Sequence, residues 1–159
     1  MVGLDPGLAN LGLGAVKQSY RSAEHLGDTL VRTSPRMNQT ERLGIIYSET
    51  KAFLAEHRPD ALAIEGQYFH RQREVAFKVG QAVGACLVAA GELDIPVFEY
   101  GPMQVKQTLV GTGRANKAQV SYMVRALLSL KQTPESHHVA DALALALTHL
   151  SSHKLKALA

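Results

Sequence analysis

The sequence predicts a single α/β domain spanning residues 1–159, built on a mixed five-stranded sheet with helices on both faces. Three strand-like segments come first, helix- and strand-like segments then alternate, and helical segments close the chain. The segment 60–65 is a short, continuously apolar strand of the kind that lies inside a parallel sheet. A chain of 159 residues can bury a sizeable core but has little room for a second domain.

The first half of the chain supplies three strands and one helix. The strands are expected at 1–4, 11–17 and 24–33, the last ending at Ser34-Pro35. Gly12 and Gly14 in the second strand allow another backbone to approach closely. A helix follows with Thr40 as its predicted N-cap, because apolar residues then recur at near-helical spacing up to Arg58-Pro59.

The second half alternates strands and helices before it becomes helical. After the 60–65 strand we expect a long helix at 71–93, in which Gly80, Gly84 and Ala85 form a small-residue face. A strand at 95–100 and a helix at 101–109 come next, followed by the loop 111–113. Asn116 is the predicted cap of a helix that runs to about residue 130, and Ser136 that of the final helix.

Composition sets modest bounds on function. The chain is 46% hydrophobic and 19% charged, which is typical of a soluble globular protein. A net charge of +3 and a pI of about 9.1 allow a polyanionic partner without requiring one. Cys86 is the only cysteine, so no disulfide framework is predicted. The longest uncharged stretch, 79–91, is too short to span a bilayer, so we expect a cytoplasmic protein without a membrane partner.

Three acidic residues occupy positions where an apolar segment should not carry charge. Asp5 and Glu65 each end a predicted strand, and Asp141 is the only polar side chain between Val139 and Leu147. Singly, Asp5 reads equally well as a turn residue before Pro-Gly, and Glu65 as a solvated strand end. Asp141 is harder to dismiss, because a buried unpaired carboxylate is costly and normally protonates, pairs or binds a metal.

Together the acids predict a metal site. If the strands that end at Asp5 and Glu65 are parallel neighbours, their carboxyl ends meet at the edge where open α/β sheets bind ligands. A helix laid across that edge would add Asp141 and His138, which lies three residues earlier on the same helix face. His137 is rotated away from that face. Oxygen ligands suit Mg²⁺ or Mn²⁺, an imidazole favours Mn²⁺, and two such ions can support phosphodiester hydrolysis.

Two further segments suggest contacts with nucleic acid. Lys106, Arg114 and Lys117 flank the loop 111–113, whose amides could bind phosphate, although a solvated charged loop is a common alternative. Directly after Glu65, the segment 67–73 combines aromatic and basic side chains: Tyr68, Phe69, Arg71 and Arg73. These aromatics could stack on unpaired bases, or simply pack at a helix N-terminus.

At these positions the sequence resembles the RuvC-type Holliday junction resolvases, the crossover junction endodeoxyribonucleases. The matching segments occur in family order over nearly the whole chain: Leu4-Asp5-Pro6-Gly7, Gly12-Leu13-Gly14, Ala63-Ile64-Glu65, 101–107, Lys117 and 140–144. The resemblance implies a ribonuclease H-like fold and a homodimer. It also implies paired, metal-dependent nicks in four-way DNA junctions during homologous recombination and repair, together with a partner branch-migration complex.

The resemblance also implies roles for single residues. Asp5, Glu65 and Asp141 fall on three of four acidic family positions, and His138 stands at the fourth, which is often aspartate. By this resemblance the four residues would hold two metal ions, with Asp5 between the ions and Glu65 on the ion that activates the attacking water. Lys106 and Lys117 fall on basic positions, and Tyr68, with Phe69 beside it, falls where an aromatic distorts the junction.

Two other functions remain open at this stage. A sugar-kinase or actin-like ATPase also opens with an Asp-x-Gly phosphate loop, but such folds need a second lobe for which 159 residues leave no room. A non-catalytic junction-binding protein with a degenerate site is the second alternative. The intact set of Asp5, Glu65 and Asp141 argues against it.

Overall fold

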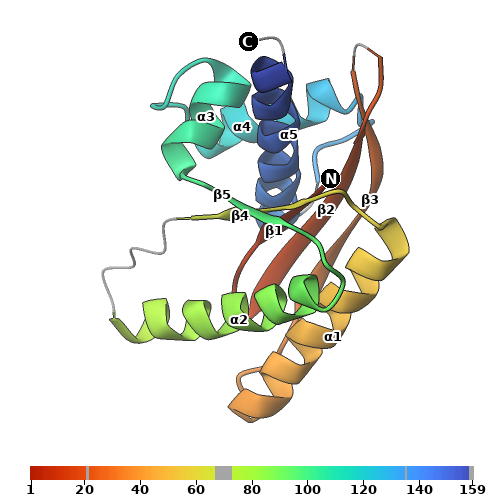
Figure 1. Ribbon diagram of the computed structural model, residues 1–159. Helices are drawn as coiled ribbons and strands as arrows, with labels where there is room; N and C mark the ends of the chain where they lie inside the picture. Colours follow the sequence, from red (N-terminus) through yellow and green to blue (C-terminus); the bar gives the residue numbers. More distant parts are fainter. Residues whose placement is uncertain (21, 67–72, 135, 158–159) are drawn as a thin grey trace.

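The predicted sheet is present and has mixed direction (Figure 1). The computed structural model describes residues 1–20, 22–66, 73–134 and 136–157. The strands are β1 (Val2–Asp5), β2 (Asn10–Gln18), β3 (Ala23–Arg32), β4 (Leu62–Glu65) and β5 (Val97–Tyr100). They lie in the order β3-β2-β1-β4-β5; the β1–β2 and β2–β3 pairs are antiparallel, and the β1–β4 and β4–β5 pairs are parallel.

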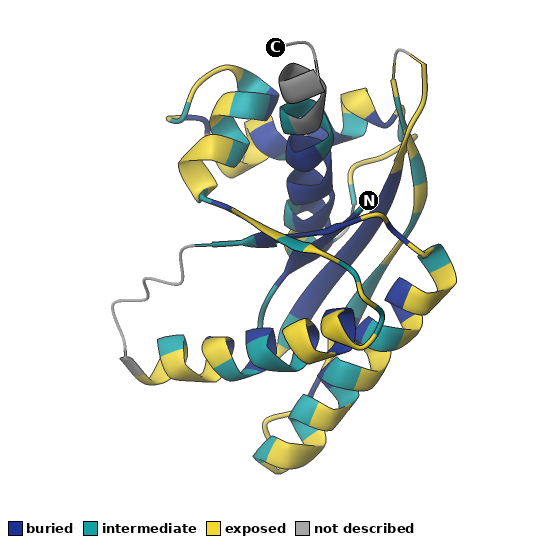
Figure 2. Ribbon diagram, viewed as in Figure 1, coloured by how far each residue is buried: buried dark blue, intermediate teal, exposed yellow. Residues whose placement is uncertain are grey.

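Helices cover both faces of the sheet, as expected (Figure 1). They are α1 (Gln39–His57), α2 (Arg73–Gly91), α3 (Pro102–Val110), α4 (Lys117–Leu127) and α5 (His137–Ala157). α1 and α2 share one core cluster with the sheet, and α3, α4 and α5 share a second. The middle of α5 is buried between the sheet and α3 and α4 (Figure 2), so its side chains are held firmly.

Several boundaries differ from the sequence prediction, and two of them have a clear local reason. The cap of α1 is Asn38 and not Thr40: Asn38 accepts from the Glu41 amide, and the Glu41 carboxylate accepts from the Asn38 amide, which makes a reciprocal capping box. α4 ends at Leu127 and not near residue 130, because Ser129 has a left-handed backbone (φ 51°) that no α-helix continues. β4 begins at Leu62, two residues later than expected.

Helix α2 is apolar on more than its inner side. By length and composition alone, Glu74–Gly91 is long and apolar enough to cross a membrane, contrary to the expectation from 79–91, although a core helix passes the same test. Its inner side chains, among them Val79, Val83 and Cys86, join the core formed with α1. Only 28% of the segment Glu74–Gly91 is buried. Helix α2 therefore also presents an apolar face that is exposed (Figure 2).

Candidate functional site

Two carboxylates meet at one edge of the sheet because β1 and β4 run in parallel. Leu4 pairs with Ile64, so Asp5 and Glu65 occupy the next position of each strand, at the carboxyl end. Asp5 is buried, with 8% of its surface exposed, and Glu65 is half-buried. This is the juxtaposition that the sequence predicted, at the edge where α/β sheets bind ligands.

Helix α5 crosses the β1–β2 pair at very close range. A Cβ atom added to Gly3 would lie 1.8 Å from the Ala142 carbonyl oxygen, and one added to Gly12 would lie 2.1 Å from the His138 carbonyl oxygen. Gly14 meets the Leu143 side chain in the same way, at 2.6 Å. The glycines therefore let the helix backbone rest on the sheet backbone, which brings the first turns of α5 beside Asp5. The sequence indicated this role for Gly12 and Gly14 but not for Gly3.

His138 joins the cluster through a direct bond to Asp5. Its Nδ1 lies 2.6 Å from Asp5 Oδ2, and because an ionised carboxylate can only accept, the imidazole donates. The other ring nitrogen, Nε2, takes no part in this bond. His137 is exposed, in agreement with its predicted rotation away from the site.

Asp141 and Glu65 line a hollow beside this pair. The hollow has a volume of about 210 Å³, and its charged lining consists of Glu65, Asp141, Lys106 and Lys117. Lys117 Nζ lies 3.3 Å from Asp141 Oδ2 and donates to it. Lys117 is the first residue of α4, whose capping box between Asn116 and Gln119 fixes where that helix starts. The predicted basic residues thus reach the carboxylates from α3 and α4.

The carboxylates perturb one another electrostatically. Burial, followed by the charges of Asp5 and Asp141, raises the pKa of Glu65. Burial also raises the pKa of Asp141, with Lys117 opposing and Asp5 adding to the shift. The hydrogen bond to Asp5 raises the pKa of His138, although burial opposes it. Burial is thus the main cause of both carboxylate shifts, and the neighbouring carboxylates add to it.

The donor set fits a hard divalent cation. Three carboxylates and one imidazole supply oxygen and nitrogen donors of the kind that Mg²⁺ and Mn²⁺ bind. Burial, with the neighbouring carboxylate charges adding to it, raises the pKa values of Glu65 and Asp141, and a bound cation would favour their ionised forms. Within the described residues, no three of these side chains converge on one point as they stand, since Asp5 pairs with His138 and Asp141 with Lys117.

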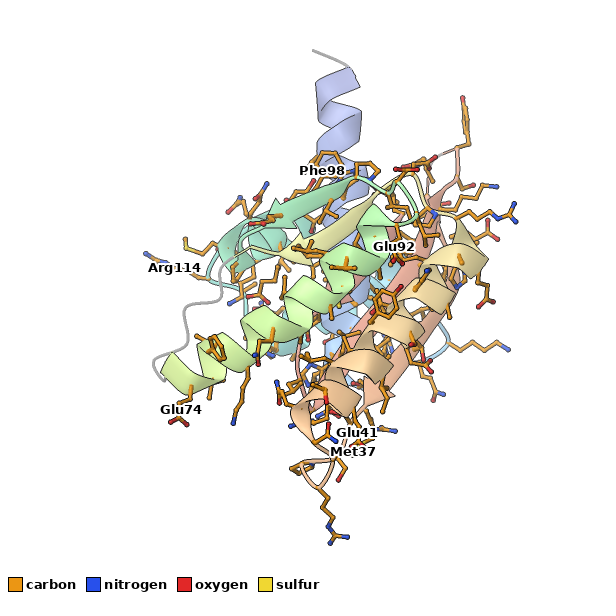
Figure 3. The ribbon with its side chains drawn as sticks, turned by 60° about the horizontal axis from the view of Figure 1, so that its bottom comes forward. Met37, Glu41, Glu74, Glu92, Phe98 and Arg114 are labelled. Carbon is orange, nitrogen blue, oxygen red and sulfur yellow. The ribbon has the colours of Figure 1, made fainter. Side chains whose placement is uncertain are left out.

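The basic loop after α3 is held by a residue that the sequence analysis did not single out. Gln107 Nε2 donates to the Gly111 carbonyl at 2.9 Å, and the Gly113 amide donates to Gln107 Oε1 at 3.1 Å. Gly111 has a left-handed backbone (φ 84°), which suits glycine. Arg114 extends outward from this loop (Figure 3). A glutamine four residues before a Gly-x-Gly turn was the available signal.

The predicted aromatic contacts cannot be placed. Tyr68, Phe69 and Arg71 lie outside the described residues. Arg73 is the first residue of α2, and the position of its side chain is likewise outside the described part. The grouping of Asp5, Glu65, His138, Asp141, Lys106 and Lys117 at one end of the sheet rests on the described residues alone.

Comparisons with known proteins identify the family of this chain. The family model for "Crossover junction endodeoxyribonuclease RuvC" matches residues 1–149. A protein of that name from Thermus thermophilus is 49% identical over 152 residues, which cover 94% of this chain and 92% of the relative. Another from Ruminiclostridium cellulolyticum is 41% identical, covering 99% of this chain and 95% of the relative.

Solved structures show the same fold. T. thermophilus RuvC in complex with a Holliday junction substrate matches with a TM-score of 0.93 and 48% identity, covering 98% of this chain and 96% of that one. The yeast mitochondrial Holliday junction resolvase matches with a TM-score of 0.67 at 10% identity, which concerns the fold alone. By its sequence along most of its length and by its ribonuclease H-like fold, the chain belongs to the RuvC family of crossover junction endodeoxyribonucleases.

Proposed function

We propose that the chain resolves four-way (Holliday) DNA junctions by paired, symmetric phosphodiester cleavage that depends on Mg²⁺ or Mn²⁺. The observation that carries the proposal is the meeting of Asp5 and Glu65 at the ends of two parallel strands, with His138 and Asp141 brought beside them by α5. Membership of a nuclease family supports it, as does the structure of the T. thermophilus relative with a Holliday junction substrate.

Asp5, Glu65, His138 and Asp141 would hold two divalent cations. Bound cations of this kind activate water and stabilise the leaving oxygen in phosphodiester hydrolysis. Asp5, the most buried of the four, would be the central ligand, and Glu65, which lines the hollow, would hold the cation that activates the attacking water. His138 must be neutral to act as a ligand; the neutral ring can keep donating its Nδ1–H to Asp5 and would offer the unprotonated Nε2 to a cation.

The basic residues would hold the DNA backbone. Lys106 and Lys117 line the same hollow as Glu65 and Asp141, so a phosphate at the carboxylates would lie within their field. A Lys117 ammonium that leaves Asp141 is free to bind that phosphate, because 73% of its side-chain surface is exposed. Arg114, further out on the loop, would contact the backbone at a distance from the cut.

Paired nicks require two sites related by a two-fold axis, and α2 offers a surface for a second copy. Phe77, Leu87 and Val88 are exposed, and a Cβ atom added to Gly80 or Gly84 would meet nothing within 4 Å. At 100° per residue these positions fall on one side of α2. Apolar exposed surface of this kind typically marks an interface, so we propose an isologous homodimer through α2.

Two further proposals follow from the family. The chain would act together with a branch-migration complex, and a substrate of chromosomal DNA implies the cytoplasm as its location.

The test of the central proposal compares a synthetic immobile junction with a linear duplex of matched sequence, each with and without Mn²⁺. Paired nicks in the junction only with Mn²⁺ are expected. Junction binding without any nick would instead favour the non-catalytic alternative.

A further inference from the structure

A second, larger hollow begins at the opposite side of the catalytic cluster. It has a volume of about 830 Å³ and lies between the α5-facing side of β3, the segment before α5 and the first turn of α5. His138, which bonds Asp5, is part of its lining. The hollow with Lys106 and Lys117 lies beside α3 and the first residue of α4, on the other side of α5 from β3 (Figure 1). Of the metal-binding candidates, His138 therefore lines one hollow, and Glu65 and Asp141 line the other.

The lining of this hollow is rich in hydrogen-bond donors and cations. Arg32 and Lys131 are exposed, and Asn10, Thr133 and Ser136 add neutral polar groups. Asn10 and Arg32 are paired across β2 and β3, so they enter the hollow side by side. Within the described part of the chain, neither Arg32 nor Lys131 makes an ion pair. Their charges are available to an external anion.

Two further features make the hollow attractive to negative charge. The first turn of α5, a helix of 21 residues, contributes His137 and His138 to the wall and contains no acidic residue that would offset its positive end. Among the described residues of the lining, the one carboxylate is Asp28, and it bonds His25, whose Nε2 lies 2.8 Å from Asp28 Oδ2. Leu30 and Leu130, both partly exposed, supply apolar surface against which sugars can pack.

We infer that this hollow, here called the β3 groove (Asn10, Arg32, Lys131, Thr133, Ser136 and His137), binds the phosphate backbone of the cleaved strand beyond the scissile phosphate. The inference rests on the proposed function. A strand whose phosphate lies at Asp5 and Glu65 must continue past the cluster in both directions. Lys106 and Lys117 receive it on the α3–α4 side, and the β3 groove receives it on the other, with Arg32 and Lys131 each contacting a phosphate.

The test measures junction binding as a function of salt for the wild type, for Arg32→Ala/Lys131→Ala and for Lys17→Ala. Lys17 is the matched control, because it is an exposed cation at the opposite end of β2, paired with Glu24 in the β2–β3 ladder. Each lost phosphate contact lowers the slope of log affinity against log salt by about 0.9, so the double variant should lose about 1.8. Lys17→Ala should leave the slope unchanged.

Methylphosphonate substitution identifies the phosphates concerned. Neutral linkages are placed one at a time within a few nucleotides on either side of the cut. The wild type should bind more weakly when a phosphate held in the β3 groove is neutralised, and the double variant should not respond to the same substitution. A double variant with the wild-type salt slope and the wild-type response to neutral linkages would overturn the inference that the β3 groove binds the phosphate backbone. So would an equal loss of slope in Lys17→Ala, which would indicate only a diffuse positive field.

Failure of the groove and failure of the proposed function give different results. If the wild type neither prefers a junction over a linear duplex nor cuts it, the proposed function is wrong, and the groove falls with it. If the wild type binds and cuts junctions while the groove variants behave like the wild type, only the groove is wrong. Both substituted side chains are exposed and without ion pairs among the described residues, so circular dichroism and melting should show intact folds.

Discussion

The backbone of Gly12 lies directly against the backbone of His138: a Cβ atom at Gly12 would be 2.1 Å from the His138 carbonyl oxygen. Because the other atoms are also backbone, no side-chain rotation relieves such a contact. The separation between β2 and α5 is therefore set by glycine, and with it the reach of His138 to Asp5. A residue with no side chain thus positions one with a candidate role in catalysis.

Gly12→Ala should push α5 away from the sheet. Overpacking typically costs about 1–3 kcal/mol, and the displacement should move both His138 and Asp141. We expect a lower melting temperature and a loss of junction cleavage that persists at temperatures where the variant is folded. Gly44→Ala is the control, because it adds the same methyl group to an exposed site on α1 with nothing within 4 Å. Wild-type cleavage by Gly12→Ala would show that α5 can shift away from β2 without loss of activity.

Much of this arrangement was readable from the sequence because it depends on local patterns. Asp5 and Glu65 end apolar strands, and their meeting followed once these two strands were taken as parallel neighbours that share a carboxyl edge. The identification of the family and of its fold and activity is confirmed by the comparisons. Gly3 escaped notice because nothing in the four residues of β1 distinguishes a glycine under a helix from one in an open strand.

The contacts that could not be predicted from the sequence mostly join residues that are far apart along the chain. The bond between His138 and Asp5 joins positions 133 residues apart, and no local pattern encodes which ring nitrogen is used. The contact of Lys117 with Asp141 is of the same kind. The cap at Asn38 was missed for a different reason: Thr40 is also a good capping residue, and only the Glu41 side chain, three residues after Asn38, decides between them.

Removing a site carboxylate should stabilise the metal-free protein while it destroys activity. Burial raises the pKa of Glu65 and Asp141, so the fold loses stability as pH rises from the unfolded pKa through the folded one. At neutral pH with chelator, Glu65→Gln and Asp141→Asn should therefore melt above the wild type. A gain of about 1 kcal/mol would raise Tm by about 2–4 °C for a chain of this size.

The same two variants separate a metal site from a merely buried carboxylate. Mg²⁺ or Mn²⁺ should raise the Tm of the wild type and raise that of the variants less. Junction cleavage should fall by about 100-fold or more, because a cation supplies several kcal/mol to the transition state and each 1.4 kcal/mol is about tenfold. Junction binding should change little. Full activity in Asp141→Asn would refute its role as a ligand.

His138 should give the enzyme a distinctive response to acid. The hydrogen bond to Asp5 raises the pKa of His138, so the protonated form, which cannot bind a metal, persists to higher pH than for a free histidine. Activity should fall on acidification through this pKa, and His138→Asp should keep its activity to lower pH. Single-turnover cleavage measured across pH compares the two proteins, and identical acid limbs would argue against an imidazole ligand.

The same substitution should change the choice of metal. An imidazole suits Mn²⁺ better than Mg²⁺, which prefers an all-oxygen shell. We expect faster cleavage with Mn²⁺ in the wild type and a smaller difference between the two metals in His138→Asp. Rates at saturating concentrations of each ion, at a pH where both proteins are fully active, measure the ratio. An unchanged ratio would place His138 outside the metal shell.

Lys117→Ala should weaken binding to the DNA backbone. Loss of one phosphate contact reduces the slope of log affinity against log salt by about one. Stability should change little, because the exposed pair of Lys117 with Asp141 contributes at most about 1 kcal/mol. Lys117→Arg keeps the charge and should retain most of the slope. If Lys117→Ala binds with the wild-type slope, the lysine does not contact a phosphate in the bound complex.

The outer face of α2 should hold the dimer together. Val88 is 56% exposed within one chain, so Val88→Glu has little to disturb in the monomer's core, whereas at an apolar two-fold interface it would bring two buried negative charges face to face. Sedimentation should show a monomer for this variant and a dimer for the wild type. Tyr122→Glu, at a similarly exposed apolar site on α4 (59%), is the matched control and should remain dimeric.

In the monomeric variant, the nicks in opposite strands of a junction should lose their coupling, so single nicks accumulate. A Val88→Glu protein that still sediments as a dimer would place the interface elsewhere.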